Sequence, residues 1–197
     1  ELAHQIGIAL IQAMRTVVDN YGEMTGLNFS LLATPAEGLS GKFTRRDASD
    51  FGEIKGVTDQ PYYTNSFHIP VDAPVTIREK IQLEAPFHAL CNGGHITYVE
   101  TDGALAGNPE AIEDIVRLMA EAGIGYGSIN HPVDRCLDCR TEQTIEDQCP
   151  VCGSGSIERI RRITGYLVGT LDRWNEAKRA EEQNRVKHDV TGPLASS

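Results

Sequence analysis

Four of the five cysteines of the chain form two pairs with a spacing typical of metal ligands. Cys136 and Cys139 form one C-x2-C pair, and Cys149 and Cys152 form a second pair after nine intervening residues. Each C-x2-C turn points two sulfurs at one centre, so two facing turns supply the four thiolates of a tetrahedral zinc site. Because protein would fill all four positions, the pattern predicts a structural zinc centre rather than a catalytic one.

Disulfides and an iron–sulfur cluster are the alternatives for these four cysteines. Disulfides are disfavoured in the intracellular protein that we expect, whereas an iron–sulfur cluster uses the same four ligands. Cys91 stands apart, beside apolar residues. A redox role is open to it, but we expect a buried thiol that packs as a small hydrophobic side chain.

A second candidate site follows the apolar stretch LNFSLLA, residues 27–33, which predicts a buried strand. Thr34 then fits the cap of a helix, Pro35 its first position and Glu37 its third, as in a capping box. With Ala36, these residues would present free N–H groups and a positive helix dipole to an anion such as phosphate. A plain helix cap is an equally good interpretation. Glu37 either closes that cap or acts as a base on a substrate hydroxyl.

Several further polar residues could do chemistry but carry no clear motif. The segment TNSFHIP contains Asn65, Ser66 and His68, while His88 and His95 lie on either side of a predicted turn. Taken singly, each is expected to be a hydrogen-bonded structural residue rather than a catalyst.

Alternating helical and strand-like segments must position these residues, which predicts an α/β fold. Asn108 as cap, Pro109 in the first turn and Gly123 after the last turn define one helix most clearly. From the periodicity we expect helices at residues 1–22, 75–90 with an interruption at Pro86, 109–122 and 174–188, and strands at 27–33, 62–71, 95–101 and 126–130.

The charge of the chain narrows the classes of function. A formal net charge of −10 argues against binding of nucleic acid or an anionic membrane as the main activity. Residues 157–188 differ, because they carry eight Lys and Arg against five acids. No apolar run approaches the roughly 20 residues of a membrane helix, and no secretion signal is present, so we expect a soluble, cytoplasmic protein.

The first predicted helix has a large apolar face and begins without a methionine. Such a face needs a partner to cover it. We therefore expect the chain to be the C-terminal piece of a longer protein.

Gly165 lies in the stretch RRITGYLVGTLDRWNEAK, where a residue without a side chain weakens either a helix or a strand. On propensity alone, a bulge, a turn or a C-cap explains it. The surrounding segments RITGYL, LDRWNEAK and RVKH follow the two C-x2-C pairs in the sequence. Together with ATPAEGLSGKF, GVTDQPYYTNSFHIPVD and EAPFHALCNGGHITY upstream, they resemble the C-terminal end of the anaerobic, class III ribonucleoside-triphosphate reductases. These are glycyl radical enzymes that make deoxyribonucleotides without oxygen.

The resemblance implies that Gly165 stores an organic radical. Only glycine has a second α-hydrogen to lose and no side chain to resist flattening of the radical centre. A separate S-adenosylmethionine radical enzyme with an iron–sulfur cluster removes that hydrogen in the family. The radical then passes to a cysteine, whose thiyl radical abstracts the 3′ hydrogen of the ribose. That cysteine belongs upstream of the matched region and Cys91 is not in its context, so we expect this chain alone to be inactive.

The resemblance also assigns the parts of the chain. Residues 1–130 would be the C-terminal part of a ten-stranded α/β barrel, 131–156 a zinc ribbon that anchors the radical loop, and 157–197 that loop, a closing helix and a flexible tail. Thr34, Pro35, Ala36 and Glu37 would hold the phosphates and ribose of a ribonucleoside triphosphate. The implied partners are the activating enzyme, the N-terminal remainder of the reductase and a second copy in a full-length homodimer.

Two alternatives remain for the function. The chain could be a separately encoded glycyl-radical subunit that docks onto a partner holding the cysteine. It could also be a zinc-ribbon interaction module with no radical and no enzymatic activity, because zinc ribbons serve binding modules and enzymes alike.

Overall fold

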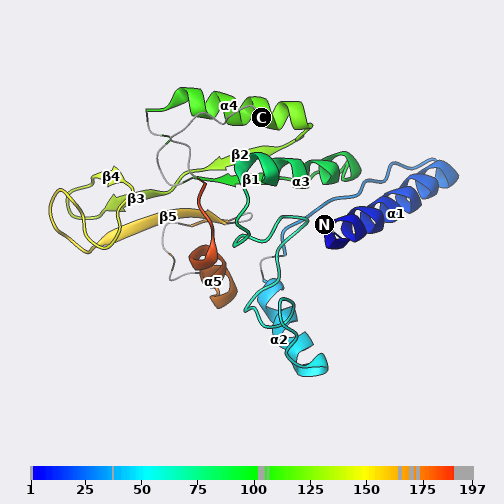
Figure 1. Ribbon diagram of the computed structural model, residues 1–197, viewed down its shortest axis with the longest axis horizontal. Helices are drawn as coiled ribbons and strands as arrows, with labels where there is room; N and C mark the ends of the chain where they lie inside the picture. The colour runs from blue at the N-terminus through cyan, green and yellow to red at the C-terminus, as the bar shows by residue number, and fades with distance from the viewer. Residues whose placement is uncertain are drawn as a thin grey trace.

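The computed structural model describes residues 2–36, 38–101, 105, 107–163, 166–168, 171 and 174–188 (Figure 1). The chain combines helices with small sheets, which is consistent with the expected α/β class, but helices and strands do not alternate regularly along it. In chain order the elements of the described residues are α1 (Leu2–Thr25), α2 (Ser40–Phe51), α3 (Ile77–Leu90), β1 (Thr97–Glu100), α4 (Pro109–Ala122), β2 (Gly127–Asn130), β3 (Val133–Cys136), β4 (Glu142–Gln143), β5 (Ile157–Ile163), β6 (Tyr166–Val168) and α5 (Glu176–Asn184).

A β-α-β unit forms the centre of the molecule. Strands β1 and β2 pair in parallel, and α4 crosses between them. Helix α4 has the bounds expected from the sequence because its end signals are local. The side chain of Asn108 accepts a hydrogen bond from the backbone N–H of Ala111, and Gly123 ends the helix in the left-handed conformation, at φ 79°.

Helix α3 and the β-α-β unit share the main hydrophobic core. Ile81 from α3, Val99 from β1 and Ile115 from α4 are fully buried in it. A capping box between Thr76 and Glu79 starts α3. The helix continues through Pro86, so the expected interruption is absent within Ile77–Leu90.

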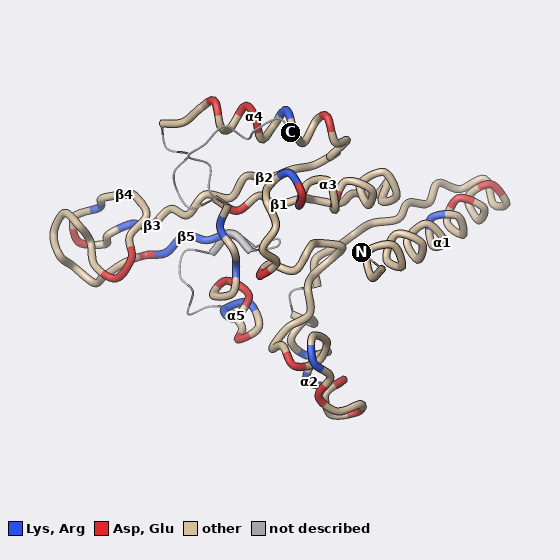
Figure 2. The backbone as a smooth tube through the Cα atoms, viewed as in Figure 1, with Lys and Arg blue, Asp and Glu red and all other residues tan. Residues whose placement is uncertain are grey.

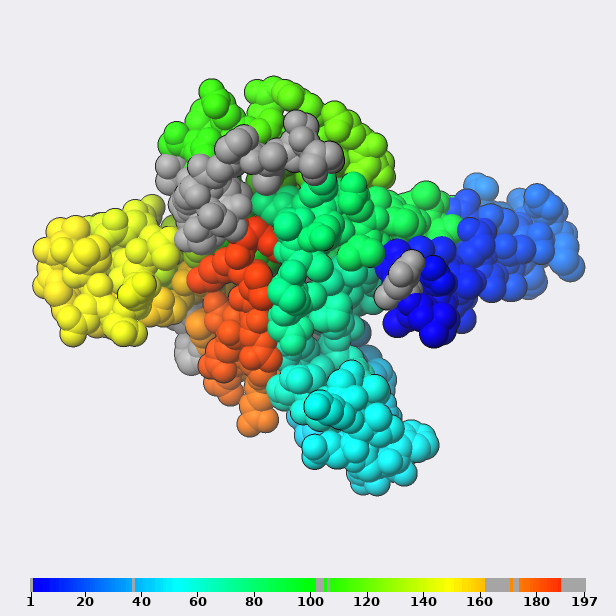
Figure 3. Space-filling view, in the orientation of Figure 1, coloured from blue at the N-terminus to red at the C-terminus, as the bar shows by residue number. Residues whose placement is uncertain are grey.

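Helix α1 packs against α3 and extends to one end of the molecule (Figures 1 and 3). It ends at Thr25, three residues beyond the predicted end, and Ile11 is its one buried residue. Leu2, Ile6 and Val17 are each more than half exposed. The large apolar face expected from the sequence is therefore uncovered in this chain.

An antiparallel sheet with strand order β4-β3-β5-β6 follows the β-α-β unit. Strand β3 pairs with β4 and β5, and β5 pairs with β6. Residues 131–156, here termed the cysteine module, lie at the end of the molecule opposite α1 (Figures 1 and 3). Basic residues follow one another along β5 (Figure 2), consistent with the positive charge expected for this region.

The C-terminal segment returns to the centre of the molecule. Helix α5 contacts α2, and the backbone N–H of His188 then donates to the carbonyl of Glu100 at the end of β1. The side chain of Asn175 caps α5, which is shorter than the predicted helix at 174–188. The expected tail at 189–197 lies outside the described residues.

Two predicted strands are wrong. Residues 27–33 run beside Gly94 through one isolated bridge at Leu32 and form no ladder. Residues 62–71 form turns, with Ser66 at φ 51°, and the Ile69 N–H bonds to the side chain of Glu84 rather than to a neighbouring strand. In the first segment, the buried side chains of Leu31 and Ala33 pack in a hydrophobic cluster with Phe87 instead of in a sheet. The ten-stranded barrel stays a prediction, because the described residues contain only two parallel strands.

No helix in the described part of the chain combines the length and the apolar character needed to cross a membrane.

Candidate functional site

The four paired cysteines converge on one point. The sulfur atoms of Cys136, Cys139, Cys149 and Cys152 all lie within 4.8 Å of one another. Two of the Sγ–Sγ distances, Cys136 to Cys152 and Cys139 to Cys149, are 3.5 Å. Four sulfurs around one zinc ion at about 2.3 Å stand roughly 3.8 Å apart. The donor set and its geometry therefore fit a metal ion such as zinc.

The two C-x2-C turns have the same backbone construction. The N–H of Arg140 donates to the carbonyl of Cys136, and the N–H of Gly153 donates to the carbonyl of Cys149, at 2.9 and 2.8 Å. Both Arg140 and Gly153 adopt positive φ, 62° and 74°. Glycine takes this conformation without strain. Both turns thus direct their sulfurs to a common centre, as the sequence predicts.

The hydrogen bonds around Cys139 favour the ionised form of its sulfur, whereas those from the other three cysteines raise the pKa of Cys152. Hydrogen bonds from the side chain and backbone of Thr141 lower the pKa of Cys139 to about 6. A thiolate is the form that binds a metal. Ile145 and Ile157 pack against the buried Cys136 and Cys149, which gives the cysteine module a small core of its own.

A buried ion pair ties the cysteine module to the hairpin of β5 and β6. The carboxylate of Asp134 on β3 is fully buried and accepts two hydrogen bonds from Arg161 on β5, at 2.5 and 3.1 Å. It also accepts the backbone N–H of Ile145 at 2.8 Å. Arg161 lies 3.5 Å from Glu182 on α5. One side chain thereby connects the module, the hairpin and the C-terminal helix.

Gly165, predicted to store the radical, lies outside the described residues. Its described neighbours are Ile163, the last residue of β5, and Tyr166, the first of β6, which pair across the two antiparallel strands. The β5–β6 pair is adjacent to β3, which carries Cys136.

The predicted phosphate segment has a different local structure from the one expected. Helix α2 begins at Ser40, six residues after Thr34, and its N-cap is Leu39 with no side-chain cap. Thr34 and Pro35 thus do not start the helix, and the capping-box prediction is wrong. Ala36 is held from two sides: its N–H donates to Asn65 Oδ1 at 2.9 Å, and its carbonyl accepts the N–H groups of Leu39 and Ser40. Glu37 lies outside the described residues.

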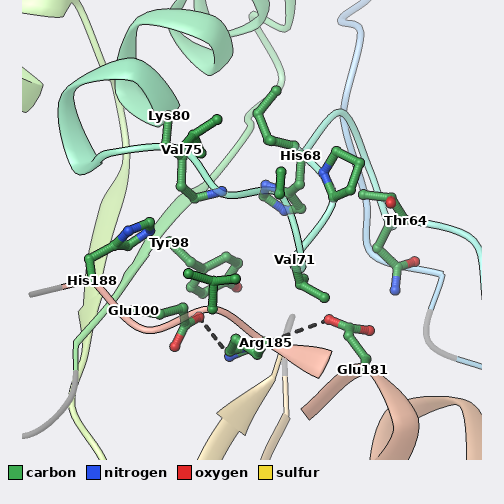
Figure 4. A pocket seen from close by; sticks show the side chains of 15 residues that line it. Thr64, His68, Val71, Val75, Lys80, Tyr98, Glu100, Glu181, Arg185 and His188 are labelled. Carbon is green, nitrogen blue, oxygen red and sulfur yellow. Dashed lines mark hydrogen bonds and ion pairs between the residues drawn. The ribbon is translucent and has the colours of Figure 1, made fainter. Parts of the chain in front are cut away.

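A small cavity of about 40 Å³ lies beside Asn65, between the turns that precede α3, strand β1 and the C-terminal segment (Figure 4). Such a volume holds water or a very small molecule. Arg185 crosses one side of it, 2.6 Å from Glu100 and 3.3 Å from Glu181. His68, Lys80, Tyr98 and His188 also line it.

Glu84 on α3 contacts three of the residues that line this cavity. Its Oε1 accepts the Ile69 N–H at 2.9 Å and the Lys80 ammonium at 2.5 Å, while Oε2 lies 3.5 Å from Nδ1 of His68. Burial alone would raise the pKa of Glu84. The hydrogen bond with His68 and the charge of Lys80 outweigh burial and lower the pKa to about 2. Glu84 is therefore a carboxylate at neutral pH.

The histidines that sequence reasoning treated singly come together here. The ring of His95 lies against those of His68 and His88, with centroids 5.2 and 4.5 Å apart. Burial lowers the pKa of His95 to about 3, and the charges of His68 and His88 act in the same direction. The sequence carries no signal for this assembly, since the three positions follow neither a helical nor a strand period. Glu84 had no motif around it and was missed.

Cys91 is 3% exposed, as expected for a thiol that packs as a small hydrophobic side chain. It contacts Ile11, Leu31 and Phe87 within one hydrophobic cluster. Burial raises the pKa of its thiol, which disfavours the reactive thiolate.

Comparison with known proteins shows similarity to one enzyme family over most of the chain. The sequence profile of the family described as "Anaerobic ribonucleoside-triphosphate reductase" matches residues 1–188. Two curated relatives of that name come from Escherichia coli strain K12, at 40% identity, and from Enterobacteria phage T4, at 37%. Both alignments cover 95% of this chain but only 27% and 32% of the relatives. The chain thus spans about a third or less of their length.

Solved structures show the same fold. A structure titled "Anaerobic ribonucleotide reductase" matches with a TM-score of 0.79 at 23% identity, over 96% of this chain and 29% of that one. The Thermotoga maritima anaerobic ribonucleotide reductase, solved in complex with dATP and CTP, matches with a TM-score of 0.69 at 21% identity, over 93% of this chain and 28% of that chain.

Proposed function

Because this chain belongs to the anaerobic ribonucleoside-triphosphate reductase family, we propose that it is the C-terminal, radical-carrying part of such an enzyme. The whole enzyme reduces ribonucleoside triphosphates to deoxyribonucleoside triphosphates for DNA synthesis. The observation that carries the proposal is the family match over residues 1–188, which includes both the cysteine centre and Gly165.

Gly165 stores the radical in this proposal. Loss of one α-hydrogen leaves an unpaired electron delocalised between the amide nitrogen on one side and the carbonyl on the other. The methyl group of an alanine at this position would block access of the activating partner to the α-hydrogen. It would also resist flattening of the radical centre. The partner is an S-adenosylmethionine radical enzyme, which supplies the oxidising chemistry from outside.

The cysteine centre anchors the radical-bearing segment. Zinc at Cys136, Cys139, Cys149 and Cys152 would fix the two turns of the module, and the Asp134–Arg161 pair would transmit that rigidity to β5. All four ligands come from protein, so zinc has a structural role here and takes no part in the reaction.

The substrate segment is Thr34–Glu37, with Glu37 as the base for a ribose hydroxyl. Support comes from Asn65, which holds the backbone of Ala36, and from the start of α2, where backbone N–H groups lack a side-chain cap. Helix N-termini of this kind favour phosphate oxygens. The chemistry also needs the thiyl cysteine, which we place in the remainder of the enzyme.

That remainder also covers α1 and completes the ten-stranded barrel in this proposal. Leu10, Met14 and Tyr21 on α1 are 60%, 44% and 54% exposed, which leaves an apolar face free for further barrel elements. The active enzyme is a homodimer of complete chains.

Electron paramagnetic resonance tests the proposal. The chain is incubated anaerobically with the activating enzyme, S-adenosylmethionine and a reductant, and we expect a glycine-centred doublet. The signal should disappear in Gly165→Ala and persist in the matched variant Gly169→Ala. A wild-type sample without the doublet, or a Gly165→Ala sample that keeps it, contradicts the radical role and favours a non-enzymatic zinc module. The reading frame upstream of this sequence distinguishes a separately encoded subunit from the C-terminal part of a longer chain.

A further inference from the structure

A second group of metal-ligating side chains lies apart from the cysteine centre. His68 in the turn before α3, Glu84 on α3 and His95 just before β1 each offer one ligand atom, and these atoms lie within 4.8 Å of one another. The side chains of His68 and Glu84 are 7% and 0% exposed, and His95 is 4% exposed. We refer to these three residues as the histidine cluster.

Two imidazoles of the cluster have nitrogen atoms without partners. Within the part of the chain that the structure describes, neither ring nitrogen of His95 nor Nε2 of His68 has a hydrogen-bond partner. A buried polar atom left in this state costs about 1–3 kcal/mol. The neighbouring His88 differs, because its Nε2 bonds to Thr97 Oγ1 at 2.9 Å and its Nδ1 accepts the Gly125 N–H at 3.2 Å.

The carboxylate of Glu84 is oriented toward the same point. Its Oε1 is occupied by the Ile69 N–H and by Lys80, which fixes the side chain and leaves Oε2 directed at His68. The hydrogen bond between Oε2 and Nδ1 is weak, because its length of 3.5 Å is at the upper limit for such a contact. The same separation suits two ligand atoms that each lie about 2.1 Å from a shared metal ion.

We propose that His68, Glu84 and His95 bind a divalent transition-metal ion, independently of the cysteine centre. Two imidazoles and one carboxylate are a donor set that suits ions such as Zn²⁺ and Fe²⁺. Three protein ligands leave coordination positions open, and His68 lines the cavity of Figure 4, which has room for water as a further ligand. Glu84, bonded to the Ile69 N–H, has the outer-shell support that ligating carboxylates usually receive.

Lys80 is the main group that opposes a cation at this site. Its ammonium lies 2.5 Å from Glu84 and would repel a metal ion bound to the other carboxylate oxygen. Glu100 and Glu181 line the same cavity, but Arg185 pairs with both, so they offset little of this repulsion. Removal of the Lys80 charge should therefore strengthen metal binding, whereas a purely structural polar cluster would only be weakened by it.

Anaerobic titration with Co²⁺ tests the site. The wild-type chain should bind two ions, one with the strong thiolate charge-transfer absorption of the cysteine centre and one with only weak visible bands. His95→Gln and His68→Gln should each lower the affinity for the second ion at least tenfold and leave the thiolate absorption unchanged. His95→Phe removes the ligand atoms but keeps an apolar ring in the buried position. Circular dichroism of each variant shows whether the chain is still folded, which distinguishes lost binding from lost folding. Cys149→Ser should show the reverse pattern, with the second ion retained.

Two further variants complete the experiment. His131→Gln removes an exposed histidine and should leave both ions in place. Lys80→Met should raise the affinity of the second ion roughly tenfold or more. The proposal is overturned if the wild-type chain binds only one ion, or if folded His95→Phe retains the second ion. It is also overturned if His131→Gln loses the second ion, or if Lys80→Met binds that ion with unchanged or lower affinity. None of these results depends on reductase activity or on the radical.

Discussion

The guanidinium of Arg161 on β5 bonds through two nitrogens to the carboxylate of Asp134 on β3, at 2.5 and 3.1 Å. Asp134 is fully buried, and Arg161 is 12% exposed. This pair crosses the β3–β5 ladder two residues from Cys136, so it connects the cysteine module with the strand that leads to Gly165. The anchoring role proposed for the cysteine module depends on this contact.

Removal of the carboxylate should destabilise the connection. In Asp134→Ala the Arg161 charge loses its buried partner, and the Ile145 N–H loses its acceptor. Loss of one partner from a buried pair costs about 3–5 kcal/mol. We expect a decrease of about 3 kcal/mol in the free energy of unfolding, measured by urea denaturation, together with faster proteolysis within residues 131–163.

Glu142→Ala is the matched control for Asp134→Ala. Glu142 pairs with Arg135 on the same sheet, at 3.7 Å, but both side chains are largely exposed. Exposed pairs contribute about 0–1 kcal/mol. Equal effects of the two substitutions would show that burial of Asp134 does not matter for the connection.

Removal of the metal should loosen the same region. Cys149→Ser, or chelation of the wild-type chain, should release about one zinc ion per chain from the cysteine centre and increase proteolysis within residues 131–188, since metal binding and folding are coupled. Metal analysis and mass spectrometry of the digestion products measure both effects. Cys91→Ser is the control, because Cys91 lies in a separate hydrophobic cluster. Unchanged protease resistance after zinc loss would contradict the anchoring role.

The elements predicted well are those with local end signals. Asn108, Pro109 and Gly123 define α4 by contacts within a few residues, so the sequence alone gives its bounds. The predicted strand at 62–71 fails for the opposite reason. Ile69 and Ala36 bond to the side chains of Glu84 and Asn65, partners that lie 15 and 29 residues away in the sequence. No local pattern encodes such contacts.

The candidate sites divide in the same way. The convergence of the four cysteines was predicted from the sequence, because each C-x2-C pair is local and its spacing is typical of metal ligands. The histidine cluster combines a turn, a helix and the start of a strand, and only the packing of α3 against β1 brings them together. The role proposed for Gly165 came from resemblance to a family, since on propensity alone such a glycine is ordinarily a turn residue.

The contact of the C-terminal segment with β1 should weaken in mild acid. Burial lowers the pKa of His188, the charge of Lys80 lowers it further, and Glu84 opposes both. The folded state thus prefers neutral His188. Its contribution to stability is complete above the ordinary histidine pKa of about 6.5 and decreases as the pH falls below that value. We expect the midpoint of thermal unfolding to fall less between pH 7 and pH 5 in His188→Gln than in the wild type. Parallel pH profiles would contradict this role of His188.

Oxygen should cut the activated chain at one place. A carbon-centred radical on the backbone adds O2, and the peroxyl product decays with cleavage of the chain, so exposure to air after activation should yield a long N-terminal fragment and a short one that begins next to Gly165. Mass spectrometry of the short fragment locates the break to the residue. Gly165→Ala treated in the same way should remain intact, whereas Gly169→Ala should be cut like the wild type. An uncut wild-type chain that had first given the glycine doublet would contradict the location of the radical at Gly165.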